Sequence, residues 1–100
     1  MNLGLSTPSI VKIKAIFGSF PEIEKAILYG SRAKGNYKKG SDIDLTLIGE
    51  DLNHKLLNQI SNQIEELYLP EMVDLSIFHQ IENKDLIEHI NRVGILFYEK

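Results

Sequence analysis

The stretch Ser41-Asp42-Ile43-Asp44-Leu45-Thr46-Leu47-Ile48 decides the fold of this 100-residue chain. Apolar and polar residues alternate through it, and successive side chains of a strand point to opposite faces of a sheet. One face therefore carries Ile43, Leu45 and Leu47. The other carries Asp42, Asp44 and Thr46. The alternation predicts a strand over residues 43–48 with an aliphatic face and a carboxylate-bearing face.

Outside this strand, hydrophobic periodicity predicts three more strands and three helices. The strands are expected over residues 26–29, 73–78 and 95–98. The helices are expected over about 7–18, over 56–67 before Pro70, and from a cap at Asn83 to Val93. Residues 30–41 form a loop with room for one helical turn from Ser31. This order predicts an α/β (α+β) domain spanning residues 1–100, with a small mixed four-stranded sheet, helices packed on one face and an acidic site on the other side.

A third carboxylate is expected on the same polar face. Val73-Asp74-Leu75-Ser76-Ile77 alternates like the first stretch, so Asp74 joins Asp42 and Asp44 if the two strands are neighbours. Such a cluster repels itself, and magnesium commonly binds few carboxylates together with phosphate oxygens. Turn capping by Asp42 and simple exposure of Asp74 are alternatives. Aspartate is disfavoured in a strand as apolar as that of Asp44, which favours a metal site suited to in-line displacement at phosphorus.

The loop before these carboxylates has features of a phosphate-binding turn. Gly30-Ser31 follows a strand and precedes a possible helix start, where backbone amides and a hydroxyl can meet a phosphate. Positive potential comes from Arg32, Lys34, Lys38 and Lys39. Arg32 is best placed to reach a phosphate because it adjoins Ser31, whereas loop lysines are usually only solvated. Gly35 and Gly40 have the spacing of a P-loop, but Ser41-Asp42 stands where that motif needs lysine, so a P-loop is excluded.

These residues resemble a known signature. Gly30-Ser31, ten intervening residues and Asp42-Ile43-Asp44 resemble the GS-x10-D-x-D pattern of the DNA polymerase beta-like nucleotidyltransferase superfamily, and the chain is similar in length and element order to its minimal nucleotidyltransferase (MNT) branch. The resemblance implies that Asp42 and Asp44 ligate two magnesium ions and that Asp74 completes the site and helps take the acceptor proton. It also implies that Gly30 and Ser31 hold the triphosphate of ATP and that Ser41 buttresses this cofactor-binding site.

The resemblance extends to a biological role. Many small members of this branch resemble antitoxins of HEPN/MNT toxin–antitoxin pairs. This implies a magnesium-dependent enzyme that transfers AMP from ATP to a hydroxyl of a HEPN-domain toxin and so neutralises it. One alternative is a catalytically idle antitoxin that acts by binding its toxin. Others are a receiver-like signalling domain, in which the Gly30-Ser31 loop would have no role, and transfer to an antibiotic or an RNA end.

Composition narrows the function classes. There is no cysteine, which excludes disulfides and thiolate metal sites, and the net charge of −3 argues against a general nucleic-acid binder. The N-terminus lacks the basic start and long apolar run of a signal peptide, and no apolar stretch approaches a membrane span. A cytoplasmic protein without membrane contact is therefore expected. The oligomeric state and the base preference stay open.

Overall fold

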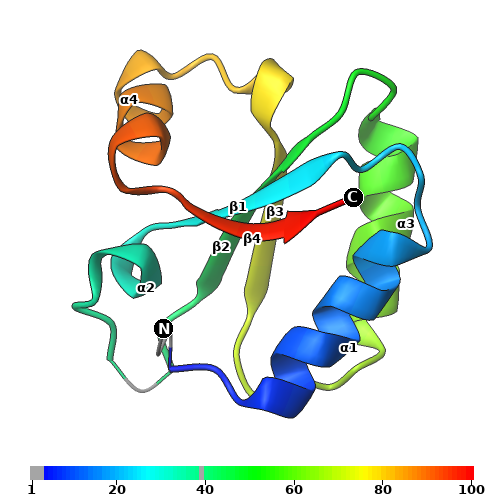
Figure 1. Ribbon diagram of the computed structural model, residues 1–100, viewed down its shortest axis with the longest axis horizontal. Helices are drawn as coiled ribbons and strands as arrows, with labels where there is room; N and C mark the ends of the chain where they lie inside the picture. The colour runs from blue at the N-terminus through cyan, green and yellow to red at the C-terminus, as the bar shows by residue number, and fades with distance from the viewer. Residues whose placement is uncertain (1–3, 39) are drawn as a thin grey trace.

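A mixed four-stranded sheet forms the centre of the molecule in the computed structural model, which describes residues 4–38 and 40–100 (Figure 1). The strands are β1 (Lys25–Tyr29), β2 (Ile43–Ile48), β3 (Val73–Ile77) and β4 (Ile95–Glu99). Their order across the sheet is β3-β2-β1-β4. β1 is antiparallel to β2 and β4, and β2 is parallel to β3, so the predicted mixed sheet is confirmed. Residues 1–3 and Lys39 lie outside the described residues.

The three longer helices begin at capping side chains, whereas the short helix after Gly30 has none. The helices are α1 (Thr7–Gly18), α2 (Ser31–Lys34), α3 (His54–Glu65) and α4 (Lys84–Val93), with a 3-10 turn η1 (Phe78–Gln80). Ser6, Asn53 and Asn83 each accept a backbone N–H of the first helical turn, which satisfies donors that have no partner within the helix. Phe78, expected as the last residue of a strand, instead begins η1. No helix in the described parts of the chain has the length and apolarity to cross a membrane.

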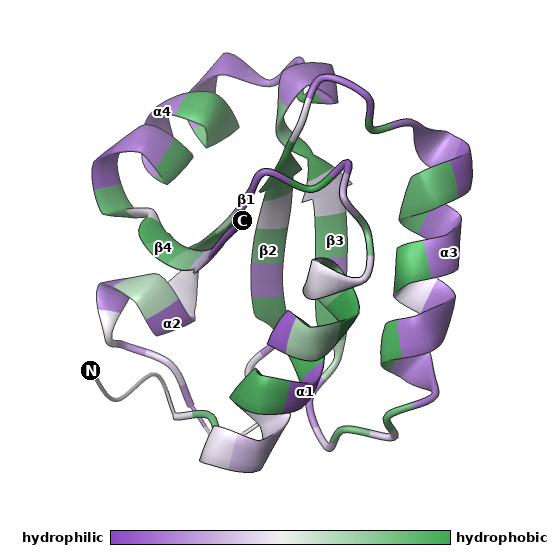
Figure 2. Cartoon of the chain, turned by 45° about the vertical axis from the view of Figure 1, so that its right-hand side comes forward, coloured by the Kyte–Doolittle hydropathy of each residue, from purple (hydrophilic) through white to green (hydrophobic). Residues whose placement is uncertain are grey.

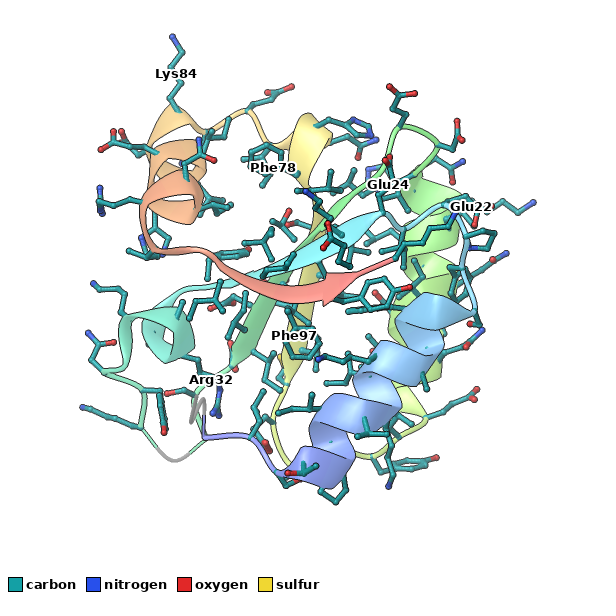
Figure 3. The ribbon with its side chains drawn as sticks, viewed as in Figure 1. Glu22, Glu24, Arg32, Phe78, Lys84 and Phe97 are labelled. Carbon is teal, nitrogen blue, oxygen red and sulfur yellow. The ribbon has the colours of Figure 1, made fainter. Side chains whose placement is uncertain are left out.

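The aliphatic face of the sheet holds the main core, and α1 and α3 cover it. In Figure 2, β2 alternates between hydrophobic and hydrophilic residues, as the sequence predicts. Ile43, Leu45 and Leu47 are fully buried together with Ile13 and Phe17 of α1 and Ile60 of α3. Phe97 of β4 lies beside α1 (Figure 3) and meets the Phe17 ring edge to face, with centroids 6.2 Å apart. Because the aliphatic side chains of β2 face this core, the acidic side chains lie on the opposite face of the sheet.

The opposite face of the sheet is not bare, because α4 lies against it on the side away from α1 and α3 (Figure 1). Ile90 of α4 is buried outside the main core cluster. Gly94, which follows α4, brings the chain so close to β1 that a Cβ would overlap the Ile90 carbonyl oxygen and press on Ile27. The expectation that the helices pack on one face is therefore wrong for α4, whose apolar side packs near Ile27 on the face of the sheet that carries the acidic residues. α4 therefore covers part of the face of the sheet that carries the acidic residues.

Candidate active site

The strand pairing brings the predicted carboxylates together. Asp44 of β2 and Asp74 of β3 are partners in the parallel register, so their side chains leave the same face of adjacent strands. The neighbouring strands that this site requires are thus confirmed. Asp42 lies two residues before Asp44, on the exposed approach to β2. Its charge reaches the Asp44 carboxyl group, which places all three acids in one electrostatic cluster.

Asp44 is the carboxyl group most affected by this cluster. Burial raises its pKa above the ordinary value, and the charges of Asp74 and Asp42 raise it further. His89 acts in the opposite direction and lowers it. Like charges held on one face oppose the ionisation of the most enclosed member. The three carboxylates therefore repel one another, and a bound cation would reduce this repulsion.

The donor chemistry of this cluster fits a hard divalent cation. Its oxygen ligands are carboxylates, which magnesium prefers, and the described residues contain no cysteine competitor. Within residues 4–38 and 40–100, however, no three acidic or histidine side chains already stand in the arrangement of a complete metal-ligand set. Two or three carboxylates with phosphate oxygens as further ligands would suit magnesium better than an all-protein cage.

The Gly30-Ser31 turn lies directly against Asp44. Gly30 has a φ of 77° and a ψ of −156°, and a Cβ at this position would overlap Asp44 Oδ2. Only glycine accommodates both the positive φ and the close approach. Ser31, half-buried, is the first residue of α2. The backbone of the turn and the carboxylate of Asp44 thus lie directly side by side.

Arg32 and Ser41 close the loop between this turn and β2. Arg32 is only 4% exposed, and its Nη2 donates to the Ser41 carbonyl oxygen at 2.8 Å. Its guanidinium also lies over the Tyr37 ring, 5.2 Å from the centroid. Ser41 Oγ accepts the Lys38 backbone N–H at 2.8 Å. Both residues brace the loop, and their predicted contact with the triphosphate stays a prediction.

Lys34 and Lys38, the described lysines of the loop, do not contribute side-chain hydrogen bonds to these loop contacts. Lys34 and Lys38 are exposed, as expected for solvated cations, while Lys39 lies outside the described residues. Their contribution in the described part of the loop is a general positive potential near the turn.

Two residues beside the carboxylates were missed by the sequence analysis. Tyr29 pairs with Asp44 across β1 and β2, and burial, together with the charges of Asp44 and Asp74, raises the pKa of its phenol. His89 of α4 meets the Tyr29 ring edge to face, with centroids 6.2 Å apart. Its Nε2 accepts the Gly30 backbone N–H at 3.1 Å. A signal existed, because His89 falls on the apolar stripe that α4 presents inward through Ile90.

Comparison with known proteins agrees with this geometry. Residues 11–100 match the family model described as polymerase beta, nucleotidyltransferase. A relative from Haemophilus influenzae, named Probable protein adenylyltransferase MntA, is 29% identical over 99 residues, which cover 98% of this chain and 86% of the relative.

Solved structures agree in fold. A chain in the crystal structure of a toxin–antitoxin complex with AMP-PNP is similar, with a TM-score of 0.72 and 20% identity, over 96% of this chain and 75% of that chain. A chain in the structure of a tri-AMPylated Shewanella oneidensis HEPN toxin in complex with its MNT antitoxin has a TM-score of 0.69 and 16% identity, over 96% of this chain and 74% of that one. These likenesses confirm the predicted α/β nucleotidyltransferase-like fold.

Proposed function

This chain belongs to the polymerase beta nucleotidyltransferase family, and we propose that it transfers the AMP group of ATP to a hydroxyl of a partner protein in a magnesium-dependent reaction. The observation that carries the proposal is the pairing of Asp44 with Asp74 beside the Gly30-Ser31 turn. Carboxylates next to a phosphate-binding turn suit displacement at phosphorus better than any binding role.

The residues of the site have distinct roles in this proposal. Asp42 and Asp44 would hold magnesium, and Asp74 would complete the site. Bound magnesium supplies positive charge to the triphosphate and favours the ionised form of the attacking hydroxyl. Asp74 would take the acceptor proton as the new oxygen–phosphorus bond forms at the α-phosphate and pyrophosphate leaves on the opposite side.

The proposed partner is a HEPN-domain toxin, with this chain as the antitoxin. The name of the Haemophilus relative describes a protein adenylyltransferase, and a structural neighbour is the MNT antitoxin in complex with an AMPylated HEPN toxin. These likenesses support the choice of acceptor class. The proposed acceptor is a hydroxyl presented by the toxin at the face that carries Asp74.

Label transfer tests this function. The protein is incubated with magnesium, ATP labelled at the α-phosphate and a HEPN-domain protein, and the products are analysed by mass spectrometry. We expect AMP on the HEPN protein with the wild type and none with Asp44→Asn. Toxicity assays with the same pair separate the alternative. If Asp44→Asn neutralises the toxin as well as the wild type does and neither modifies it, the protein acts by contact alone.

A further inference from the structure

The backbone N–H of the phosphate-binding turn is already engaged within the protein. Gly30 donates its N–H to His89 Nε2 at 3.1 Å, across 59 positions of sequence. A donor held in this way is not free to bind a phosphate oxygen at the same time. The role of Gly30 in the turn must therefore differ from that of a simple phosphate donor.

His89 joins three parts of the site at once. Its imidazole is half-buried, accepts from Gly30 and packs edge to face on Tyr29, the residue that precedes the turn. Because Nε2 accepts a hydrogen bond, the proton of the neutral imidazole is on Nδ1. The ring thus contacts both the turn and the residue before it, and the turn lies against Asp44.

The position of α4 makes this contact specific. The close approach of Gly94 to Ile27 of β1, and the burial of Ile90, fix the helix against the strand that ends in Tyr29. Asn83 begins the helix by accepting the N–H groups of Asp85 and Leu86. The packing of the C-terminal half of α4 on β1 thus places His89 beside the turn.

We propose that His89 is a positioning residue that fixes the peptide between Tyr29 and Gly30, so that Ser31 is the residue of the turn that donates to the triphosphate. Gly30 then acts through its close approach to Asp44 and through its fixed peptide plane. The proposal rests on the proposed function, because the triphosphate is its ligand. It adds a residue from α4 to a site otherwise built from β1, α2, β2 and β3.

Two substitutions of His89 test the hydrogen-bond acceptor and the aromatic ring separately. His89→Phe keeps an aromatic ring against Tyr29 but removes the acceptor, whereas His89→Gln retains a side-chain oxygen that can accept the Gly30 N–H. We expect His89→Phe to weaken magnesium–ATP binding about tenfold, the effect of one lost hydrogen bond. The change should appear in KM for ATP rather than in kcat. His89→Gln should recover most of the affinity, and His79→Ala, an exposed histidine in η1, should have wild-type affinity.

A second measurement does not depend on nucleotide. Amide hydrogen exchange, followed by nuclear magnetic resonance on the whole protein without ligand, reports the Gly30 N–H directly. We expect faster exchange of this amide in His89→Phe than in the wild type and His89→Gln. Unchanged exchange and unchanged ATP affinity in His89→Phe would overturn the proposal. A wild-type protein that binds no ATP, yet shows the expected exchange pattern, would refute the proposed function and retain His89 as the residue that holds the turn.

Discussion

Gly30 and Gly35 lie on either side of the short helix α2, and both have a positive φ, of 77° and 83°. A Cβ at Gly30 would overlap Asp44 Oδ2, whereas nothing lies within 4 Å of a Cβ at Gly35. Alanine at Gly35, which has left-handed backbone, should lower the unfolding free energy by about 1–2 kcal/mol. Alanine at Gly30 should cost more, because its ψ of −156° belongs to a region essentially restricted to glycine and its Cβ would also overlap Asp44 Oδ2. We expect only Gly30→Ala to abolish the rise in Tm with magnesium and ATP, measured by differential scanning calorimetry.

Gly35→Ala is the control for the backbone cost in this experiment. If both variants kept the full ligand-dependent rise in Tm, the contact between the turn and Asp44 would have no part in nucleotide binding.

The raised pKa of Asp44 predicts an effect of pH on stability. The folded state holds the Asp44 proton more tightly than the unfolded chain does, so ionisation lowers the unfolding free energy as the pH rises through the folded pKa. The Asp44→Asn variant cannot ionise at this position, so its unfolding free energy does not fall in this way. In a metal-free buffer with chelator, we expect Asp44→Asn to become more stable than the wild type as the pH rises from about 4, the unfolded value, towards neutrality. Denaturant melts at several pH values measure the difference, and a difference that shrank with pH would contradict the assignment.

At the scale of the helices, the two asparagine caps offer a matched pair. Asn83 caps α4 by accepting from Asp85 and Leu86, and Asn53 caps α3 by accepting from Leu56 at 2.9 Å. Replacing either by alanine should cost about 1 kcal/mol of unfolding free energy. Because α4 carries His89, we expect only Asn83→Ala also to speed hydrogen exchange at the Gly30 amide. Equal exchange in both variants would show that the start of α4 does not control the turn.

The elements themselves were largely predictable from sequence. Alternation in residues 43–48 and 73–77 identified both acidic strands, and Asn83 was identified as a helix cap because a side-chain oxygen there satisfies backbone donors. What the pattern could not give was the face that α4 covers. An amphipathic period shows that one side of a helix is buried, but it does not show against which surface.

The same limit explains which residues of the site could be predicted from the sequence. Asp42, Asp44 and Asp74 could be found because their chemistry departs from the local strand pattern. The expected contact of Arg32 with a phosphate stays a prediction. Its burial in the loop could not be predicted, because the contact with Ser41 depends on how residues 35–41 fold back. His89 was missed because its partner Gly30 is distant in sequence.

For the whole molecule, ligand binding should raise the free energy of unfolding. A ligand that binds only the folded state adds about 2.7 kcal/mol at 100 times its Kd, which for a domain of this size raises Tm by roughly ten degrees or more. We expect magnesium with ATP to give such a rise in calorimetry and chelator to remove it. Asp42→Asn and Asp44→Asn should remove the rise without unfolding the protein. A rise of unchanged size in both variants would place the nucleotide elsewhere.

The parallel pairing of β2 with β3 has a consequence for how the protein matures. A hairpin-like pair such as β1 and β2 can form as soon as both segments have left the ribosome, but a parallel partner requires the whole crossover through α3 to be synthesised first. A nascent chain that ends before β3 therefore carries Asp44 without Asp74, and one that ends before α4 lacks His89. Under the proposed function, nucleotide should thus bind and stabilise only a chain that already includes β3 and α4.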